Sequence, residues 1–169
     1  MYYQHINQFI NVLTSLQNIL DKAAKYAEEK KFSVDVLLSS RLYPDQFHLL
    51  KQIQVACDMV KLGASRLSGK EAPIHDDSEK NLEELQSRVN SVIEYLSSFN
   101  ENDFSEADNK RIELRLRQGF YLTSSEYLIQ FVIPNFYFHV TTAYAILRNN
   151  GLEIGKMDFL GKVDFKEIK

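Results

Sequence analysis

The chain has 169 residues, with 20 basic and 23 acidic side chains and a formal net charge of -3. A length of this order fits one domain with a full hydrophobic core, so residues 1–169 are expected to form a single domain. The weakly negative charge excludes a general attraction to nucleic acid. The 44% hydrophobic and 25% charged residues are ordinary globular usage, which indicates neither a disordered nor a membrane protein.

The cysteine content and the N-terminal residues predict a cytoplasmic protein. Cys57 is the only cysteine and can form no intramolecular disulfide, and no basic stretch followed by an apolar core opens the sequence. The most apolar stretch, Tyr127 to Leu147, contains Pro134 and several polar residues. It is therefore a poor membrane span, and it is better interpreted as a core helix.

The first part of the chain predicts two long helices. Between Tyr3 and Lys30 apolar residues recur every three or four positions, which is the period of an amphipathic helix. Pro44 suits the first position of the second helix, because the N–H that proline lacks would have no partner there. Gly69 suits the end of that helix, since glycine adopts the left-handed conformation at no steric cost.

A third helix is predicted after the polar loop Lys70 to Asp77, with an apolar stripe that ends at Phe99. Either Asp76, together with Glu79, or Ser78 alone is expected to cap its N-terminus. His75 has no partner at a ligand's spacing and is expected to face solvent. The acidic segment Asn100 to Asn109 is expected to be a surface connection.

The period changes after this segment. From Arg111 to Arg117 apolar and charged residues alternate, which is typical of a half-buried strand. Phe120 to Thr123 can return as a partner strand, so a small β-hairpin is expected beside the bundle. Glu113 interrupts the arginines, which favours a solvated strand face over an anion-binding strip.

The last helix is predicted to open with a capping box formed by Thr123 and Glu126 and to end at Gly151. Pro134 is expected to bend or split it, because the proline ring clashes with the preceding turn. The tail, residues 152–169, is expected to lie over the bundle as an irregular strap. Together these elements predict a mainly α-helical protein, a four-helix bundle with a small β-hairpin before the last helix.

Three strings of residues carry a resemblance to a known family. They are SRLYPDQF at 40–47, PNFYFHVTTAYAILR at 134–148 and GKMDFLG at 155–161. With them the chain resembles the domain-of-unknown-function family numbered 1993, of bacteria and fungi, in the DinB-like four-helix-bundle superfamily. The resemblance implies an up-down-down-up helix order and no established activity, because the family is uncharacterised.

Many relatives in that superfamily have a metal site of three histidines, one near the start of the second helix and an HxxxH pair on the last. His48 and His139 match two of these positions, but Ala143 stands where the third histidine is expected. Catalytic metal sites generally use three protein ligands, so no bound metal or other cofactor is predicted. Asp45 or Asn135 would have to complete an unusual ligand set with the two histidines.

Polar residues on the last helix give the clearest sign of a pocket. Asn135, His139 and Thr142 follow at spacings of four and three and project from one side, where polar side chains need partners or a wet cavity. His48 faces the same side if the two helix ends are neighbours, and Arg41 can supply a positive group there. The pocket candidates are therefore Arg41, Asp45, His48, Asn135, His139 and Thr142.

Three functions fit these observations. The first is a small-molecule-binding or vestigial enzyme domain with a pocket between the second and last long helices. The second is a metal-dependent hydrolase or thiol transferase with an incomplete histidine site. The third is a structural or interaction module whose histidines are packed in the core. The free edge of the predicted hairpin also favours a homodimer.

Overall fold

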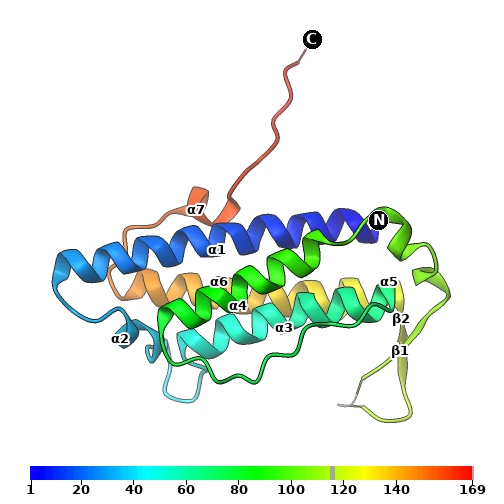
Figure 1. Ribbon diagram of the computed structural model, residues 1–169, viewed down its shortest axis with the longest axis horizontal. Helices are drawn as coiled ribbons and strands as arrows, with labels where there is room; N and C mark the ends of the chain where they lie inside the picture. The colour runs from blue at the N-terminus through cyan, green and yellow to red at the C-terminus, as the bar shows by residue number, and fades with distance from the viewer. Residues whose placement is uncertain (115–116, 169) are drawn as a thin grey trace.

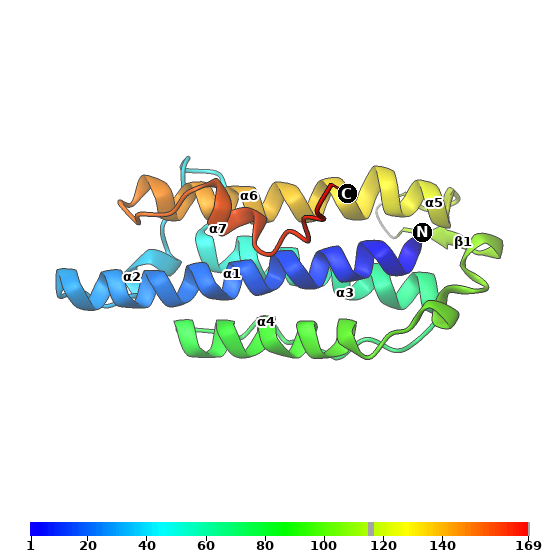
Figure 2. The ribbon, with the colours of Figure 1, turned by 90° about the horizontal axis from the view of Figure 1, so that it is seen from above.

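The computed structural model describes residues 1–114 and 117–168, and four long helices pack side by side in it (Figure 1). They are α1 (Tyr2–Lys30), α3 (Leu49–Ser68), α4 (Leu82–Ser97) and α6 (Ile133–Asn149). α1 and α6 run in one direction, and α3 and α4 run in the other (Figures 1 and 2). α3 packs against both α6 and α4, while α1 packs against α4. The predicted mainly α-helical bundle is confirmed.

The apolar stripes of the helices meet in one core, and α3 and α6 approach each other most closely there. A β-carbon at Gly63 of α3 would lie only 2.9 Å from Cγ1 of Val132, just before α6. On the other side of α6, the ring of Phe136 meets the ring of Phe9 edge to face, with 5.0 Å between their centroids. The close α3–α6 contact brings polar side chains of these two helices within hydrogen-bond distance.

The start of α3 differs from the prediction. The short helix α2 (Asp35–Leu38) follows α1, but α3 begins at Leu49, and Pro44 lies in a turn before it. His48 is the N-cap residue, and its Nδ1 accepts a hydrogen bond from the backbone N–H of Lys51 at 3.3 Å. The prediction was wrong because the first N–H groups of a helix need an acceptor. The side chain of His48 supplies one and so determines the boundary, whereas Pro44 has no acceptor in its side chain.

A crossover segment, residues 70–81, makes the parallel arrangement of α3 and α4 possible. α3 ends as predicted at Gly69, whose φ of 90° is left-handed, and the chain then returns along the bundle (Figure 1). Asn81 caps α4, and its Oδ1 accepts from the N–H of Glu84 at 2.9 Å. The predicted caps, Asp76 and Ser78, were both wrong, because the returning segment needs more residues to reach the start of α4.

A buried arginine fastens the crossover segment. The side chain of Arg88 on α4 is 1% exposed, and it donates to Asp77 at 2.7 Å and to Glu79 at 3.0 Å in the segment. It also donates to Asp58 on α3 at 2.9 Å, and Lys61 pairs with the same carboxylate at 2.8 Å. These five residues, the Arg88 cluster, tie α3, α4 and the segment together, since buried charges are tolerated only when paired.

Residues 100–109 form two 3₁₀ turns, η1 (Glu101–Phe104) and η2 (Ala107–Asn109). The segment was expected to be a surface connection, but Phe104 and Ala107 are buried. The expectation was wrong because it followed the acidic majority of the segment, whereas its two apolar side chains join the core.

The hairpin is present as predicted. β1 (Arg111–Glu113) pairs antiparallel with β2 (Tyr121–Thr123), and Ile112 stands opposite Leu122. Ile112 is buried beneath the sheet, as the alternation requires. Residues 115 and 116 of the predicted strand lie outside the described residues.

The last helical region is continuous from the hairpin to Asn149. Thr123 and Glu126 form the predicted capping box at α5 (Ser124–Glu126). The helix then widens into the π-helical η3 (Tyr127–Val132) and continues as α6. The wider turn before Pro134 accommodates a residue with no N–H, so the helix type changes and the helix does not split. No helix in the described ranges is long and apolar enough to span a membrane.

The C-terminal strap covers α1 over part of its predicted length. Asp158 of α7 (Lys156–Leu160) pairs with Lys22, and Asn11 donates to the carbonyl of Leu160 at 3.0 Å. Residues 162–168 are exposed and lead away from the bundle in Figure 1, contrary to the expectation. Charged residues alternate here with Val163, Phe165 and Ile168, which remain exposed, and docking these apolar side chains would also desolvate the charges.

Candidate functional site

His139 lies in the middle of α6, and its imidazole reaches α3. It is 8% exposed, and its Nδ1 lies 2.7 Å from Oε1 of Gln52 in the first turn of α3. Gln52 is 1% exposed, and its Nε2 donates to the carbonyl oxygen of Phe47 at 3.0 Å. A hydrogen-bonded chain therefore runs from Phe47 through Gln52 to His139.

This chain determines which ring nitrogen of His139 carries the hydrogen. Because the amide nitrogen of Gln52 donates to Phe47, its Oε1 must be the acceptor, and Nδ1 of His139 must be the donor. Burial lowers the pKa of His139 below the ordinary 6.5, so the imidazole is neutral at pH 7. Nε2 is then an unprotonated acceptor, and no hydrogen bond in the described ranges uses it.

His75 of the crossover segment provides a contrast. Its Nδ1 lies 2.9 Å from Nζ of Lys61, which can only donate, so its Nε2 carries the hydrogen and faces Oγ of Ser91 at 3.3 Å. Burial and the positive charges of Lys61 and Arg88 lower its pKa. The expectation that His75 faces solvent was wrong, because both ring nitrogens are bound within the protein.

His48 lies close to the same chain of hydrogen bonds. Its backbone carbonyl accepts from the N–H of Gln52 at 3.0 Å, which places the two residues one helical turn apart. The half-buried imidazole lines a cavity of about 550 Å³ between α2, α3 and the crossover segment. Lys51, Gln54 and Asp77 also line this cavity, so its wall is mostly polar.

Asn135 and Thr142 bond to their own helix. Asn135 Nδ2 donates to the carbonyl of Phe131 at 2.6 Å, and Thr142 Oγ1 donates to that of Phe138 at 2.7 Å. Asn135, Thr142 and His139 line none of the five cavities described for residues 1–114 and 117–168. The side chains of Asn135 and Thr142 thus have hydrogen-bond partners in their own helix, whereas Nε2 of His139 has none in the described ranges.

Arg41 and Asp45 lie on the surface in the turn that precedes α3. The guanidinium of Arg41 donates to the carbonyl of Pro44 at 3.2 Å, and both candidate side chains are exposed. The ion pairs found in residues 1–114 and 117–168 include neither of them. The structure therefore brings His48 and His139 to the α3–α6 pair and leaves these two residues outside it.

The candidate metal ligands do not form a cluster in the described part of the chain. No group of three or more histidine, cysteine, aspartate or glutamate side chains there is placed to hold a metal ion. Ala143, four residues after His139, is fully buried and offers no ligand atom. The Nδ1 atom of His139 is bonded to Gln52, and that of His48 to the backbone N–H of Lys51.

Gln52 was not among the predicted site residues, although a signal for it was present in the sequence. Gln52 lies three residues after Leu49 and four before Ala56, both of which are buried, so it falls on the buried stripe of α3. A glutamine at such a position needs a buried partner. His139 supplies it, from a position 87 residues further along the chain.

Comparisons with known proteins agree with this fold. The family model "Domain of unknown function (DUF1993)" matches residues 1–160. A crystal structure of a DinB family member from Shewanella denitrificans is 50% identical, with a TM-score of 0.93. That similarity covers 96% of this chain and 93% of the other. No curated protein matches the chain.

Proposed function

The chain belongs to the family of the domain of unknown function DUF1993, within the DinB family, and on that premise we propose that it binds a small polar molecule at His139. The observation that carries the proposal is the neutral imidazole whose Nδ1 is bonded to Gln52 and whose Nε2 has no partner in the described ranges. A lone pair held in this way accepts a hydrogen bond from a hydroxyl, amide or amine group.

The ligand site of this proposal lies between α3 and α6, the second and last of the long helices. The hydrogen-bonded chain through Gln52 prevents the imidazole from rotating, and a fixed acceptor binds with a smaller loss of entropy. The cavity beside His48 lies at the same end of α3 as Gln52. The same Nε2 can also remove a proton from a bound molecule, so a vestigial or active enzyme is included in the proposal.

Nuclear magnetic resonance of the ring nitrogens tests the proposal directly. We expect a neutral His139 with its hydrogen on Nδ1 and a pKa below 6.5. Glycerol, acetamide and ethanolamine serve as donor probes, and at least one should shift the Nε2 signal. His75→Gln is the matched control, because both nitrogens of His75 are already bound, and it should leave that shift unchanged.

His139→Ala separates this proposal from a purely structural module. In the binding protein it abolishes the response to the probes while unfolding stays cooperative. In a structural module it only leaves Gln52 without a partner, which costs about 1–3 kcal/mol of unfolding free energy. A hydrogen on Nε2, or no probe response at all in the unmodified protein, would contradict the binding proposal.

A metal-dependent hydrolase or thiol transferase remains the alternative that follows from the superfamily. It requires His48 and His139 to share an ion with a further ligand, whereas His139 Nδ1 and His48 Nδ1 each bond within the protein. Elemental analysis of untagged protein distinguishes the two. About one ion per chain, lost in both His48→Ala and His139→Ala, would favour the metal enzyme.

We also propose that two copies pair and that the protein acts in the cytoplasm. The two-stranded sheet supports pairing, because each strand has a free edge in the described structure that another strand can bind. The buried free thiol of Cys57 supports a reducing compartment. Light scattering at micromolar concentration should return twice the mass of one chain, and the mass of a single chain would contradict pairing.

A further inference from the structure

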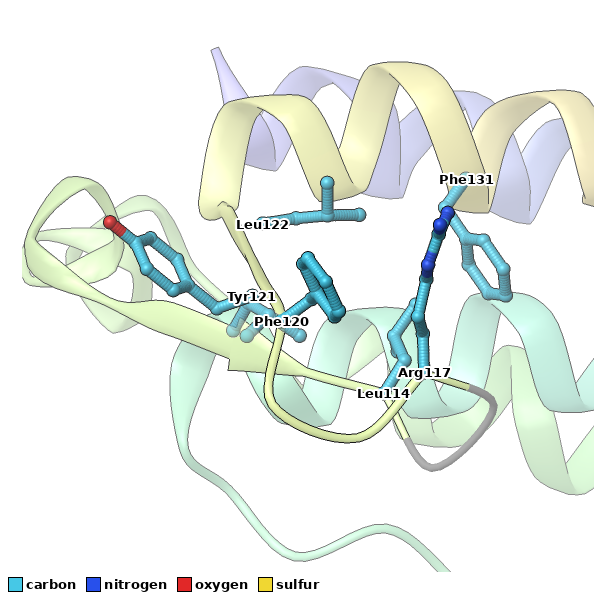
Figure 3. A pocket seen from close by; sticks show the side chains of 7 residues that line it. Leu114, Arg117, Phe120, Tyr121, Leu122 and Phe131 are labelled. Atoms are coloured by element: carbon cyan, nitrogen blue, oxygen red, sulfur yellow. The ribbon is translucent and has the colours of Figure 1, made fainter.

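A second cavity lies beneath the hairpin, at the end of the bundle where α3 ends and η3 begins. Its volume is about 380 Å³, within the range of small-molecule sites. Apolar side chains form most of its wall, and Figure 3 shows them converging from the hairpin and from η3. They are Ile112, Leu114, Phe120, Leu122 and Phe131.

Among the described residues of this wall, Arg117 is the one charged side chain. Figure 3 places it between Leu114 and Phe131, and its guanidinium carbon lies 5.1 Å from the ring centre of Phe120. The ion pairs of the described residues do not include Arg117. A cation held over an aromatic ring without a carboxylate is stabilised only weakly, so its charge is available to a ligand.

The surroundings of Arg117 are positively charged as well. Arg66, Lys110 and Arg111 line a shallow cavity that shares Ile112 with the first, and Glu113 is the only carboxylate in that lining. Lys110 donates to a backbone carbonyl and Arg66 to a tyrosine hydroxyl, so neither charge is neutralised by these contacts. The local field therefore favours an anion, although the whole chain is weakly negative.

We propose that this cavity binds a small amphipathic carboxylate, an anion whose body is a short alkyl chain or a single aromatic ring. The body would be buried against Leu114, Phe120 and Phe131, where removing apolar surface from water is favourable. The carboxylate would take the two parallel N–H donors that a guanidinium presents. The apolar wall supplies affinity, and Arg117 supplies the selection of an acid over its neutral analogues.

This site is separate from the one at His139. Gln52 lies in the first turn of α3 and Arg66 in its last, which places them about 20 Å apart along the helix axis. Failure of either proposal therefore leaves the other intact. Variants at the hairpin change one site, and variants at His139 change the other.

The experiment is a calorimetric titration of the full chain with octanoate and with its neutral analogue octanamide. We expect octanoate to bind at least tenfold more tightly than octanamide. Arg117→Gln should weaken octanoate binding at least tenfold and octanamide binding less than twofold. Arg117 is exposed, so the variant is expected to fold, and circular dichroism checks this.

Arg111→Gln is the matched control. Arg111 stacks on Tyr121 at 4.7 Å in the same hairpin but does not line the cavity, so its loss should change octanoate affinity less than threefold. Equal binding of octanoate and octanamide, or equal losses in the two arginine variants, would overturn the proposal. Absence of octanoate binding would overturn it as well.

Discussion

Arg88, on α4, and Arg117, between the two strands of the hairpin, are held in opposite ways. Arg88 is 1% exposed and has carboxylate partners from α3 and from the crossover segment. Arg117 is exposed, and an aromatic ring is its described contact. The first cation joins three parts of the chain, and the second joins none. The paired charge therefore serves stability, and the exposed one is the charge for which we propose a role in recognition.

Arg88→Met gives the largest effect that this comparison predicts. The substitution leaves Asp58, Asp77 and Glu79 facing one another with Lys61 as the remaining cation of the cluster. Removing one partner from a buried ion pair typically costs about 3–5 kcal/mol of unfolding free energy. Because the carboxylates are partly exposed, the expected loss is about 3 kcal/mol. Urea unfolding measures the loss of unfolding free energy. A loss below about 1 kcal/mol would mean that the cluster contributes little to stability.

Acid should weaken the same cluster. A hydrogen bond from Lys51 lowers the pKa of Asp77 below 3.8. For Glu79, burial raises the pKa, but hydrogen bonds from its own backbone and from Arg88 and Gln54 outweigh burial and hold it below 4.5. The unfolded chain therefore binds more protons, so this stability is complete above about pH 5 and is lost as pH falls through the folded values.

The urea midpoint between pH 5 and pH 3 tests this dependence. It should fall more steeply in the unmodified protein than in Arg88→Met, where part of the carboxylate stabilisation is already absent. Parallel curves would show that other acidic groups control the acid response.

His75→Gln should reveal a smaller effect at milder pH. The folded pKa of His75 lies below 6.5, mainly because of burial, so the unfolded chain takes up a proton first as pH falls. The stability that a neutral His75 contributes is complete above pH 6.5 and declines below it. Between pH 7 and pH 5 the variant should lose less stability than the unmodified protein, by about 1 kcal/mol at most. His139→Gln serves as the comparison, since burial shifts its pKa in the same direction.

Arg117→Met gives the smallest effect on stability. An exposed cation over an aromatic ring contributes about 0.5–1 kcal/mol, and methionine keeps part of the apolar contact. We expect a change below about 0.5 kcal/mol in the unfolding free energy. A loss approaching that of Arg88→Met would remove the contrast between the two arginines.

Features encoded within a few residues were predictable from the sequence. The helical stripes, the left-handed Gly69 and the capping box of Thr123 and Glu126 were each found where their local pattern placed them. The hairpin was found for the same reason, since a change of period is visible within a handful of positions.

Features that depend on distant partners were not predictable in this way. The start of α4 depends on how far the crossover segment must travel, and this length is set by the parallel packing of α3 and α4. In the sequence Arg88 resembles an ordinary helical arginine, because its three carboxylate partners lie in other segments of the chain. Likewise, the choice of ring nitrogen in His139 follows only from Gln52, which no local pattern connects to it.

The crossover segment also has a consequence for the order of folding. Because α3 and α4 are parallel, they cannot form the rapid helical hairpin that short connections produce between sequence neighbours. The pairings of α3 with α6 and of α1 with α4 each close a long loop before their contacts form. The chain should therefore fold more slowly than a simple up-and-down bundle of its length, and α3 stays incompletely covered until the last long helix has been made.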